Sequence, residues 1–444
     1  MQFFHYLFTQ TPLNFLIQPL WRDEAFSYSL AIKPFFSMVF LTAKDFNPPL
    51  YYALLAGWMR FFGSSEITLR LPSLIFYLLT VYASDHILAE ILHIKTWRRY
   101  LYLLLIAINP ILLYYAFEAR MYSMFACLAT VSFYALYMKK RKLYFWSIMF
   151  GLFTHYFMVF VVLTQLGALY VAHKRTMLRS TMKVLVIPGI IFLLWLLFVA
   201  LQSTHSQGFW ILPSELKDLI YLPAVLYTGY ESTHRFYTQN AAGIYTPLLL
   251  LTGVFVLIAV YAFIEYAQHI FDREKWTFFF FLFWGVVPPL VIFGISFVKP
   301  IFLPRYIIFS APGMVFFIIY ILQHLPRSPR YIVLALLFIF TWNYHKLQLE
   351  YRTKKYPAEK LISLKGTFQP NESLYLMNEL DYFVALYYLP NVDVKIYGKT
   401  YDEIPAYVGK VLIPQSAVVN QLPVYPHRAV VVDENGDVQK ESIK

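Results

Sequence analysis

Long apolar segments alternate with short polar connections over residues 1–345. Residues 184–201 and 276–297 stay apolar over about the 17 to 25 positions that a helix needs to cross a bilayer core. A segment in lipid must satisfy its own backbone hydrogen bonds, so these segments are predicted to be helices. About ten membrane-spanning helices are expected, at residues 66–92, 99–117, 119–138, 143–154, 156–172, 184–202, 241–267, 276–298, 304–324 and 330–345.

The pattern changes after residue 345, where charges return and short apolar runs alternate with helix-like stretches. Strands are expected at residues 373–377, 392–396, 411–413 and 429–432, helices at 357–364 and 381–389, and a hairpin turn at 433–437. The fold class is therefore an all-α polytopic membrane domain over residues 1–345, followed by a small soluble α/β domain over residues 346–444.

Composition agrees with a membrane protein, because 59% of the residues are hydrophobic and only 14% are charged. The net charge of +12 does not indicate nucleic-acid binding: residues 346–444 hold 12 Lys or Arg against 12 Asp or Glu, so the basic excess lies in the membrane part. The single cysteine, Cys127, lies in an apolar run and allows no disulfide framework.

The basic residues of the membrane part are concentrated in every second connection between the expected spans. One set of connections holds 15 Lys or Arg, and the opposite set, without the first 65 residues and the tail, holds 5. Positively charged loops stay in the cytoplasm. A multi-pass plasma-membrane protein is expected, with residues 20–65, 203–240 and 346–444 on the extracytoplasmic side.

Three acidic residues stand out in the first outer segment: Asp23, Glu24 and Asp45. They are flanked by amphipathic stretches rich in aromatic residues, a composition typical of helices in the membrane interface. A carboxylate at this boundary can accept a proton from an acceptor hydroxyl. Structural roles are also open: Asp23 could be a helix N-cap, Glu24 a first-turn residue, and Asp45 the start of a turn before Pro48.

Two arginines are candidates for binding a phosphate on the same side. Arg120 lies at the outer end of two expected spans, and Arg305 lies at the start of another. Cations there would stabilise the charge that a leaving phosphate gains when a glycosidic bond breaks. The alternatives are an ion pair between Arg120 and Glu118, and snorkelling of Arg305 to the interface.

His155 lies between two short expected spans and could bind a divalent metal together with Asp45 or Glu24. It could equally be a hydrogen-bonded polar residue. The outer connection 203–240 offers further sugar or acceptor contacts, none singled out by spacing: His205, Glu215, Asp218, Glu231, His234 and Arg235.

Four stretches together resemble the GT-C superfamily of polyprenyl-phosphate-sugar-dependent glycosyltransferases: residues 21–25, 45–52, 62–72 and 118–122. The resemblance is to the bacterial branch similar to protein O-mannosyltransferases and the lipid A aminoarabinose transferase, of glycosyltransferase family 39. Residues 304–306 are a looser match. Two features depart from the family: Asn47 stands where protein O-mannosyltransferases usually have histidine, and the first 20 residues are too short and polar for the family's first span, so that this helix is expected to be truncated or lost.

The resemblance implies a GT-C fold, a polyprenyl-phosphate donor of one sugar, a hexose with mannose as the candidate, and inversion at the anomeric carbon. It implies that Asp23 is the catalytic base and that Asp45 positions the acceptor or a metal, with Glu24 as a further catalytic candidate. Substrate contacts then fall on Asn47, Glu118, Arg120, Tyr122, Arg305 and Tyr306. The implied partners are the lipid-linked donor, a hydroxyl acceptor on glycan, lipid or protein, and membrane lipid; an organic cofactor is not expected.

Other readings stay open. A flippase or transporter for lipid-linked sugars should place ionisable groups inside its spans, where Asp85 is a conspicuous acid. A polysaccharide polymerase or ligase would act at the same face and would differ by taking an oligosaccharide on a diphosphate. A structural or receptor role for the C-terminal domain would leave the acidic loop unexplained.

Overall fold

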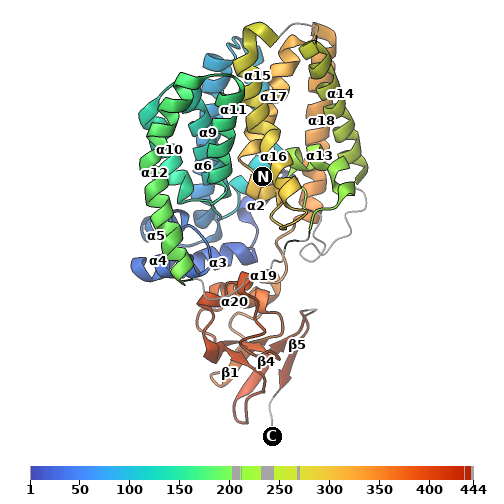
Figure 1. The fold of residues 1–444 in the computed structure, drawn as a ribbon. Helices are drawn as coiled ribbons and strands as arrows, with labels where there is room; N and C mark the ends of the chain where they lie inside the picture. Colours follow the sequence, from blue (N-terminus) through green and yellow to red (C-terminus); the bar gives the residue numbers. More distant parts are fainter. Residues whose placement is uncertain are drawn as a thin grey trace. The chain divides into compact units, whose positions relative to one another are not determined.

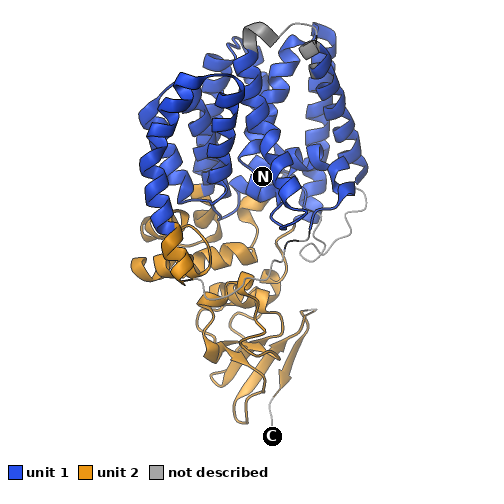
Figure 2. Ribbon diagram, viewed as in Figure 1, with its two compact units in different colours: residues 1–14, 73–195, 211–352 blue, residues 15–72, 196–210, 353–444 orange. Residues whose placement is uncertain are grey.

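The computed structural model describes residues 2–202, 211, 213–231, 245–267, 271–434 and 436–441. It is mostly helical and carries one mixed sheet in its C-terminal part (Figure 1). The chain divides into two compact units (Figure 2). The first comprises residues 1–14, 73–195 and 211–352, and the second comprises 15–72, 196–210 and 353–444. Residues 15–72, which include both acidic motifs, thus share a unit with residues 353–444.

The first unit is a bundle of helices. Its α-helices after the N-terminal one are α6 (Glu66–His86, which begins in the second unit), α7 (Trp97–Ala107), α8 (Pro110–Ala116), α9 (Tyr122–Tyr137), α10 (Arg141–Leu152), α11 (Met158–Val171), α12 (Arg175–Gln202, which ends in the second unit), α13 (Leu222–Thr228), α14 (Tyr245–Ala267), α15 (Phe271–Gly285), α16 (Val287–Ile295), α17 (Ser310–His324) and α18 (Arg327–Tyr351). The N-terminal helix α1 (Gln2–Gln10) and the π-helix η1 (Ile87–Ile91) belong to the same unit, as do the 3-10 helices η2 (Leu216–Ile220) and η4 (Pro304–Ile307).

Four helices in the described part of the chain are long and apolar enough to cross a membrane: Glu66–Ile91, Arg175–Gln202, Lys275–Ile295 and Arg327–Tyr351. Helices α7 and α8 would make a fifth span, but they bend by 64° because Pro110 interrupts the helix and Asn109 caps the next one. Most of the other expected spans are shorter apolar helices. The multi-span membrane character is confirmed. By length and composition, however, fewer described helices qualify as spans than the ten that were expected.

Close contact between α15 and α17 forms the core of the bundle. The Trp284 ring stacks on Phe133 at 4.3 Å, and its indole N–H donates to the Phe309 carbonyl oxygen at 2.7 Å. A side chain at Gly313 would lie 2.4 Å from the Trp284 ring. Small residues let helices in a membrane approach this closely, which is why glycine occurs here.

The second unit combines short helices with a sheet. Its helices are α2 (Asn14–Ile17), α3 (Arg22–Ala31), α4 (Phe35–Lys44), α5 (Leu50–Phe62), α19 (Ala358–Ser363) and α20 (Tyr382–Tyr388). Aromatic side chains of α4 and α5 are exposed, among them Phe36 and Phe61, as expected for helices in the membrane interface.

The described residues of this unit form five strands in the order β3-β2-β1-β4-β5. Strands β1 (Glu372–Leu376), β2 (Val394–Tyr397), β3 (Val418–Val419) and β4 (Arg428–Val432) are parallel, and β5 (Val438–Glu441) pairs antiparallel with β4. The expected strands near 373, 392 and 429, both helices and the hairpin are confirmed. The strand expected at 411–413 is wrong: Lys410–Leu412 is a 3-10 helix, η7, because it lies between Gly409 in the left-handed region and Pro414.

Candidate active site

The first acidic motif forms the start of helix α3. The N-cap is Trp21 and the helix begins at Arg22, so Asp23 lies inside the first turn and its alternative role as N-cap is wrong. Glu24 occupies the third helical position, where its Oε2 accepts from the Trp21 backbone N–H at 2.9 Å. The structural alternative for Glu24 as a first-turn residue is therefore confirmed.

Glu24 is completely buried and held by two cations. The Arg70 guanidinium binds it in a bidentate manner, with Nε–Oε1 at 2.7 Å and Nη2–Oε2 at 2.8 Å. Lys354 Nζ lies 3.2 Å from Oε2. Burial opposes ionisation, but the charges of Arg70 and Lys354 and the hydrogen bonds prevail and lower the pKa of Glu24 from 4.5 to about 2. Glu24 is thus charged at neutral pH and anchors the first turn of α3 through Arg70 and Lys354.

Asp23 has a different environment although it is the next residue. It is half-buried, and among the described residues its carboxylate has neither a hydrogen-bond donor nor an ion-pair partner; only its backbone oxygen is used, by the Ser27 hydroxyl at 2.9 Å. Of the two adjacent acids, Asp23 is the one available to a ligand.

The second acidic motif follows helix α4. Asp45 is its C-cap, and Asn47 donates from Nδ2 to Asp45 Oδ2 at 2.6 Å. The Asn47 backbone N–H in turn donates to the Thr42 carbonyl oxygen at 2.8 Å. The structure therefore brings together two residues predicted to act on substrate, and Asn47 orients the carboxylate of Asp45.

The Arg120 motif is a buried turn in the first unit, between α8 and α9. Arg120 and Glu118 are both buried, and the Ser73 hydroxyl donates to the Arg120 carbonyl oxygen at 3.2 Å. The Arg120 guanidinium carbon lies 5.8 Å from the centre of the Tyr122 ring. A buried arginine beside an aromatic face keeps its charge and suits the binding of an anion.

Arg305 is held by an acid from the long connection 203–240. Its Nη1 lies 3.1 Å from Glu231 Oε2, and the Tyr115 hydroxyl donates to Glu231 Oε1 at 3.2 Å. Glu231 is almost fully buried and Arg305 is only 15% exposed in its side chain, so Arg305 does not snorkel to the surface. The spacing of acids in residues 203–240 did not single out Glu231.

His155 lies in a cluster of aromatic rings. It stacks on Phe125 at 4.6 Å and contacts Tyr306 at 5.4 Å and Tyr122 at 6.1 Å. Burial and the nearby Arg120 charge lower the pKa of His155 to about 3, so the ring is neutral. Within the described ranges, no three His, Cys, Asp or Glu side chains form a group that could hold a metal ion. The metal role of His155 stays a prediction.

Several residues of these clusters carried no signal in the sequence. Lys354 and Asp381 lie 330 and 359 residues from their partners in α3, too far for any spacing argument. In the connection 203–240, Glu215 forms an exposed pair with Lys217, and the Asp218 carboxylate accepts from the Glu215 backbone N–H. The other candidates there lie outside the described residues: His205, His234 and Arg235.

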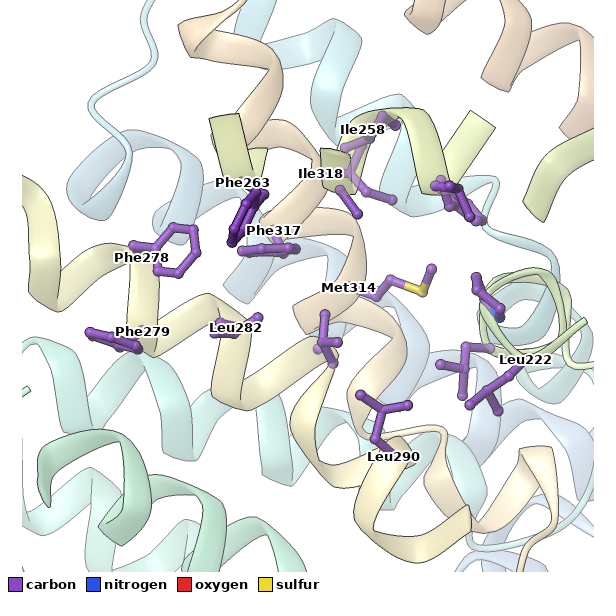
Figure 3. A pocket seen from close by; sticks show the side chains of 17 residues that line it. Leu222, Ile258, Phe263, Phe278, Phe279, Leu282, Leu290, Met314, Phe317 and Ile318 are labelled. Atoms are coloured by element: carbon purple, nitrogen blue, oxygen red, sulfur yellow. The ribbon is translucent and has the colours of Figure 1, made fainter. Parts of the chain in front are cut away.

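An apolar cavity of about 580 Å³ lies in the first unit among helices α13 to α17 (Figure 3). Phe255, Phe279, Leu290, Met314 and Phe317 are among its lining residues. A cavity of this size and character matches a hydrocarbon chain better than a sugar, because its walls offer almost no hydrogen-bonding groups.

The protein combines a polytopic helical fold with a mixed sheet in its C-terminal part. Two solved structures share the fold over nearly the whole chain: ArnT from Cupriavidus metallidurans in the apo state, at 12% identity, TM-score 0.59 and coverage of 94% of this chain and 89% of that one; and the same protein bound to undecaprenyl phosphate, at 13% identity, TM-score 0.59 and coverage of 97% and 93%. No family model and no curated protein matches the sequence. The fold expected from the resemblance is confirmed.

Proposed function

We propose that this protein is a membrane glycosyltransferase that moves one sugar from a polyprenyl-phosphate carrier to an acceptor hydroxyl at the extracytoplasmic face. The observation that carries the proposal is the difference in environment between the adjacent carboxylates of Asp23 and Glu24. The Glu24 carboxylate forms ion pairs with Arg70 and Lys354, whereas no described residue forms a hydrogen bond or ion pair with the Asp23 carboxylate. The ArnT-like fold and the undecaprenyl phosphate bound in one ArnT structure support the choice of donor.

The proposed reaction is a single displacement. Asp23 accepts the proton of the acceptor hydroxyl, whose oxygen attacks the anomeric carbon while the bond from that carbon to the phosphate oxygen breaks. The lipid phosphate leaves with the electron pair and gains negative charge. Attack from the face opposite the leaving phosphate inverts the anomeric centre.

Arg120 is proposed to stabilise the departing phosphate. A preorganised cation in a site with little water acts strongly on charge that develops in the transition state. Arg305 is a second candidate, although Glu231 already neutralises much of its charge. Asp45, oriented by Asn47, is proposed to position the acceptor.

The transporter alternative is less well supported. Asp85, the acid that a transport pathway would use, forms an ion pair with Arg99 at the end of α6. A polymerase or ligase is distinguished by its donor, because it requires an oligosaccharide on a diphosphate.

The proposal is tested with purified protein and a panel of polyprenyl-phosphate sugars, with the products identified by mass spectrometry. Asp23→Asn is expected to lower the rate by a factor of at least about 10², typical of the loss of a general base. Asp402→Asn, which changes an exposed aspartate of the same unit, is the matched control. Turnover by folded Asp23→Asn at the wild-type rate would remove Asp23 from the mechanism.

A further inference from the structure

The two neighbours of Asp23 are both held by the C-terminal segment of the second unit. Arg22 Nε donates to Asp381 Oδ1 at 2.7 Å, with Nη2 at 2.6 Å from the same oxygen. Glu24 Oε2 lies 3.2 Å from Lys354 Nζ. The Asp381 and Lys354 side chains are 4% and 2% exposed. Since these pairs hold the residues on either side of Asp23, they fix the backbone turn that carries its carboxylate.

Helix α3 also packs along helix α20 of the same segment. The Phe26 and Phe383 rings meet edge to face at 5.4 Å, and the Tyr28 and Tyr387 rings do so at 4.9 Å. Gly409 brings a loop so close that a side chain there would lie 2.5 Å from the Phe26 ring. The contact with the C-terminal segment therefore continues along α3 beyond its first turn.

We propose that Asp381 and Lys354 are positioning residues for sugar transfer: through Arg22 and Glu24 they hold the first turn of α3 so that Asp23 keeps one orientation toward the acceptor. This inference rests on the proposed function, in which Asp23 is the base. A displacement of about 1 Å at a reacting group can cost about 10²-fold in rate. The C-terminal segment thereby becomes part of the catalytic apparatus, although it supplies no group that touches the reacting atoms.

Asp381 is the more informative of the two, because Glu24 retains its bidentate contact with Arg70 when Lys354 is lost. The groups that face Asp381 are Arg22 from α3, Glu379 from the 3-10 helix η5 (Glu379–Asp381), and Tyr356. Burial raises the pKa of Asp381 to about 6, while Arg22 acts to lower it. Protonation near pH 6 removes the ion pair, so wild-type turnover should decline below that pH.

The test is Asp381→Asn in the whole 444-residue chain, with Asp393→Asn as control. Asp393 belongs to the same segment and also forms an ion pair, with Lys395, but its side chain is 60% exposed. Asp381→Asn is expected to lower kcat by about 10- to 100-fold while the donor KM changes less than about threefold. The decline of kcat near pH 6 should disappear, and Asp381→Glu should recover part of the rate. An unchanged kcat in folded Asp381→Asn overturns the proposal.

Hydrogen exchange of the α3 backbone amides gives a readout that does not depend on activity. Asp381→Asn should accelerate exchange in α3 relative to Asp393→Asn, and equal exchange overturns the proposal even if the variant is inactive. If Asp381→Asn does not fold, Arg22→Gln removes the same ion pair from the other side. The two proposals can fail separately. If the wild-type protein transfers no sugar, the proposed function is refuted. If α3 exchanges faster in Asp381→Asn in that case, the structural part of the inference, that the C-terminal segment fixes α3, is still supported.

Discussion

Replacing Glu24 with glutamine removes the charge at the centre of the anchor that holds α3. The substitution preserves shape and leaves Arg70 and Lys354 buried around a neutral amide. The fall in the pKa of Glu24 from 4.5 to about 2 corresponds to about 3 kcal/mol of folding free energy at pH 7. We therefore expect Glu24→Gln to destabilise α3 by about this amount.

The pH dependence has a definite sign. A carboxyl group whose pKa is lowered by folding contributes stability above its unfolded pKa and loses that contribution as the pH falls through its folded pKa. For Glu24 the contribution is complete above about pH 4.5 and is lost toward pH 2. The difference between wild type and Glu24→Gln should therefore be largest at neutral pH and close as acid is added.

Hydrogen exchange of the α3 amides, measured in detergent, reports this local stability. A loss of about 3 kcal/mol should raise the exchange rate by a factor of roughly 10². The control is Glu215→Gln, since Glu215 is also paired with a lysine but its side chain is 63% exposed. An exposed pair contributes about 0 to 1 kcal/mol. Equal exchange in the two variants, or a difference that persists at pH 2, would refute the reasoning.

Three further predictions concern residues of the first unit. Gly313→Ala places a methyl group 2.4 Å from the Trp284 ring and should lower the free energy of unfolding by about 1 to 3 kcal/mol, which is measured as a lower unfolding temperature. Gly294→Ala is the control, because the space around Gly294 is open and its unfolding temperature should not change. Asp85→Asn should leave sugar transfer within about twofold of wild type, because the Asp85–Arg99 pair lies outside the proposed chemistry; loss of transfer would favour a transport pathway. If His155 binds a required divalent ion, chelation should lower the rate and His155→Gln should raise the metal concentration needed to restore it; a rate unaffected by chelation would contradict that role.

The sequence by itself determined the membrane character, the acidic segment and most of the C-terminal strands. These features depend on local patterns: apolar runs long enough for a bilayer, alternating short runs, and turn residues such as those between β4 and β5. The resemblance over residues 20–125 also indicated the fold, which the structural comparison confirmed.

Only the tertiary structure separated the roles of Asp23 and Glu24. Both acids occupy the first turn of one helix, so local pattern treats them alike. Their difference comes from Arg70 and Lys354, which are 46 and 330 residues away and are brought to Glu24 by packing within the second unit. The ion pair between Arg305 and Glu231, in the first unit, also joins two residues that are far apart in the sequence. A periodic pattern fixes which face of an element is buried, but the partner of a buried charge depends on which distant segments the fold places against that face.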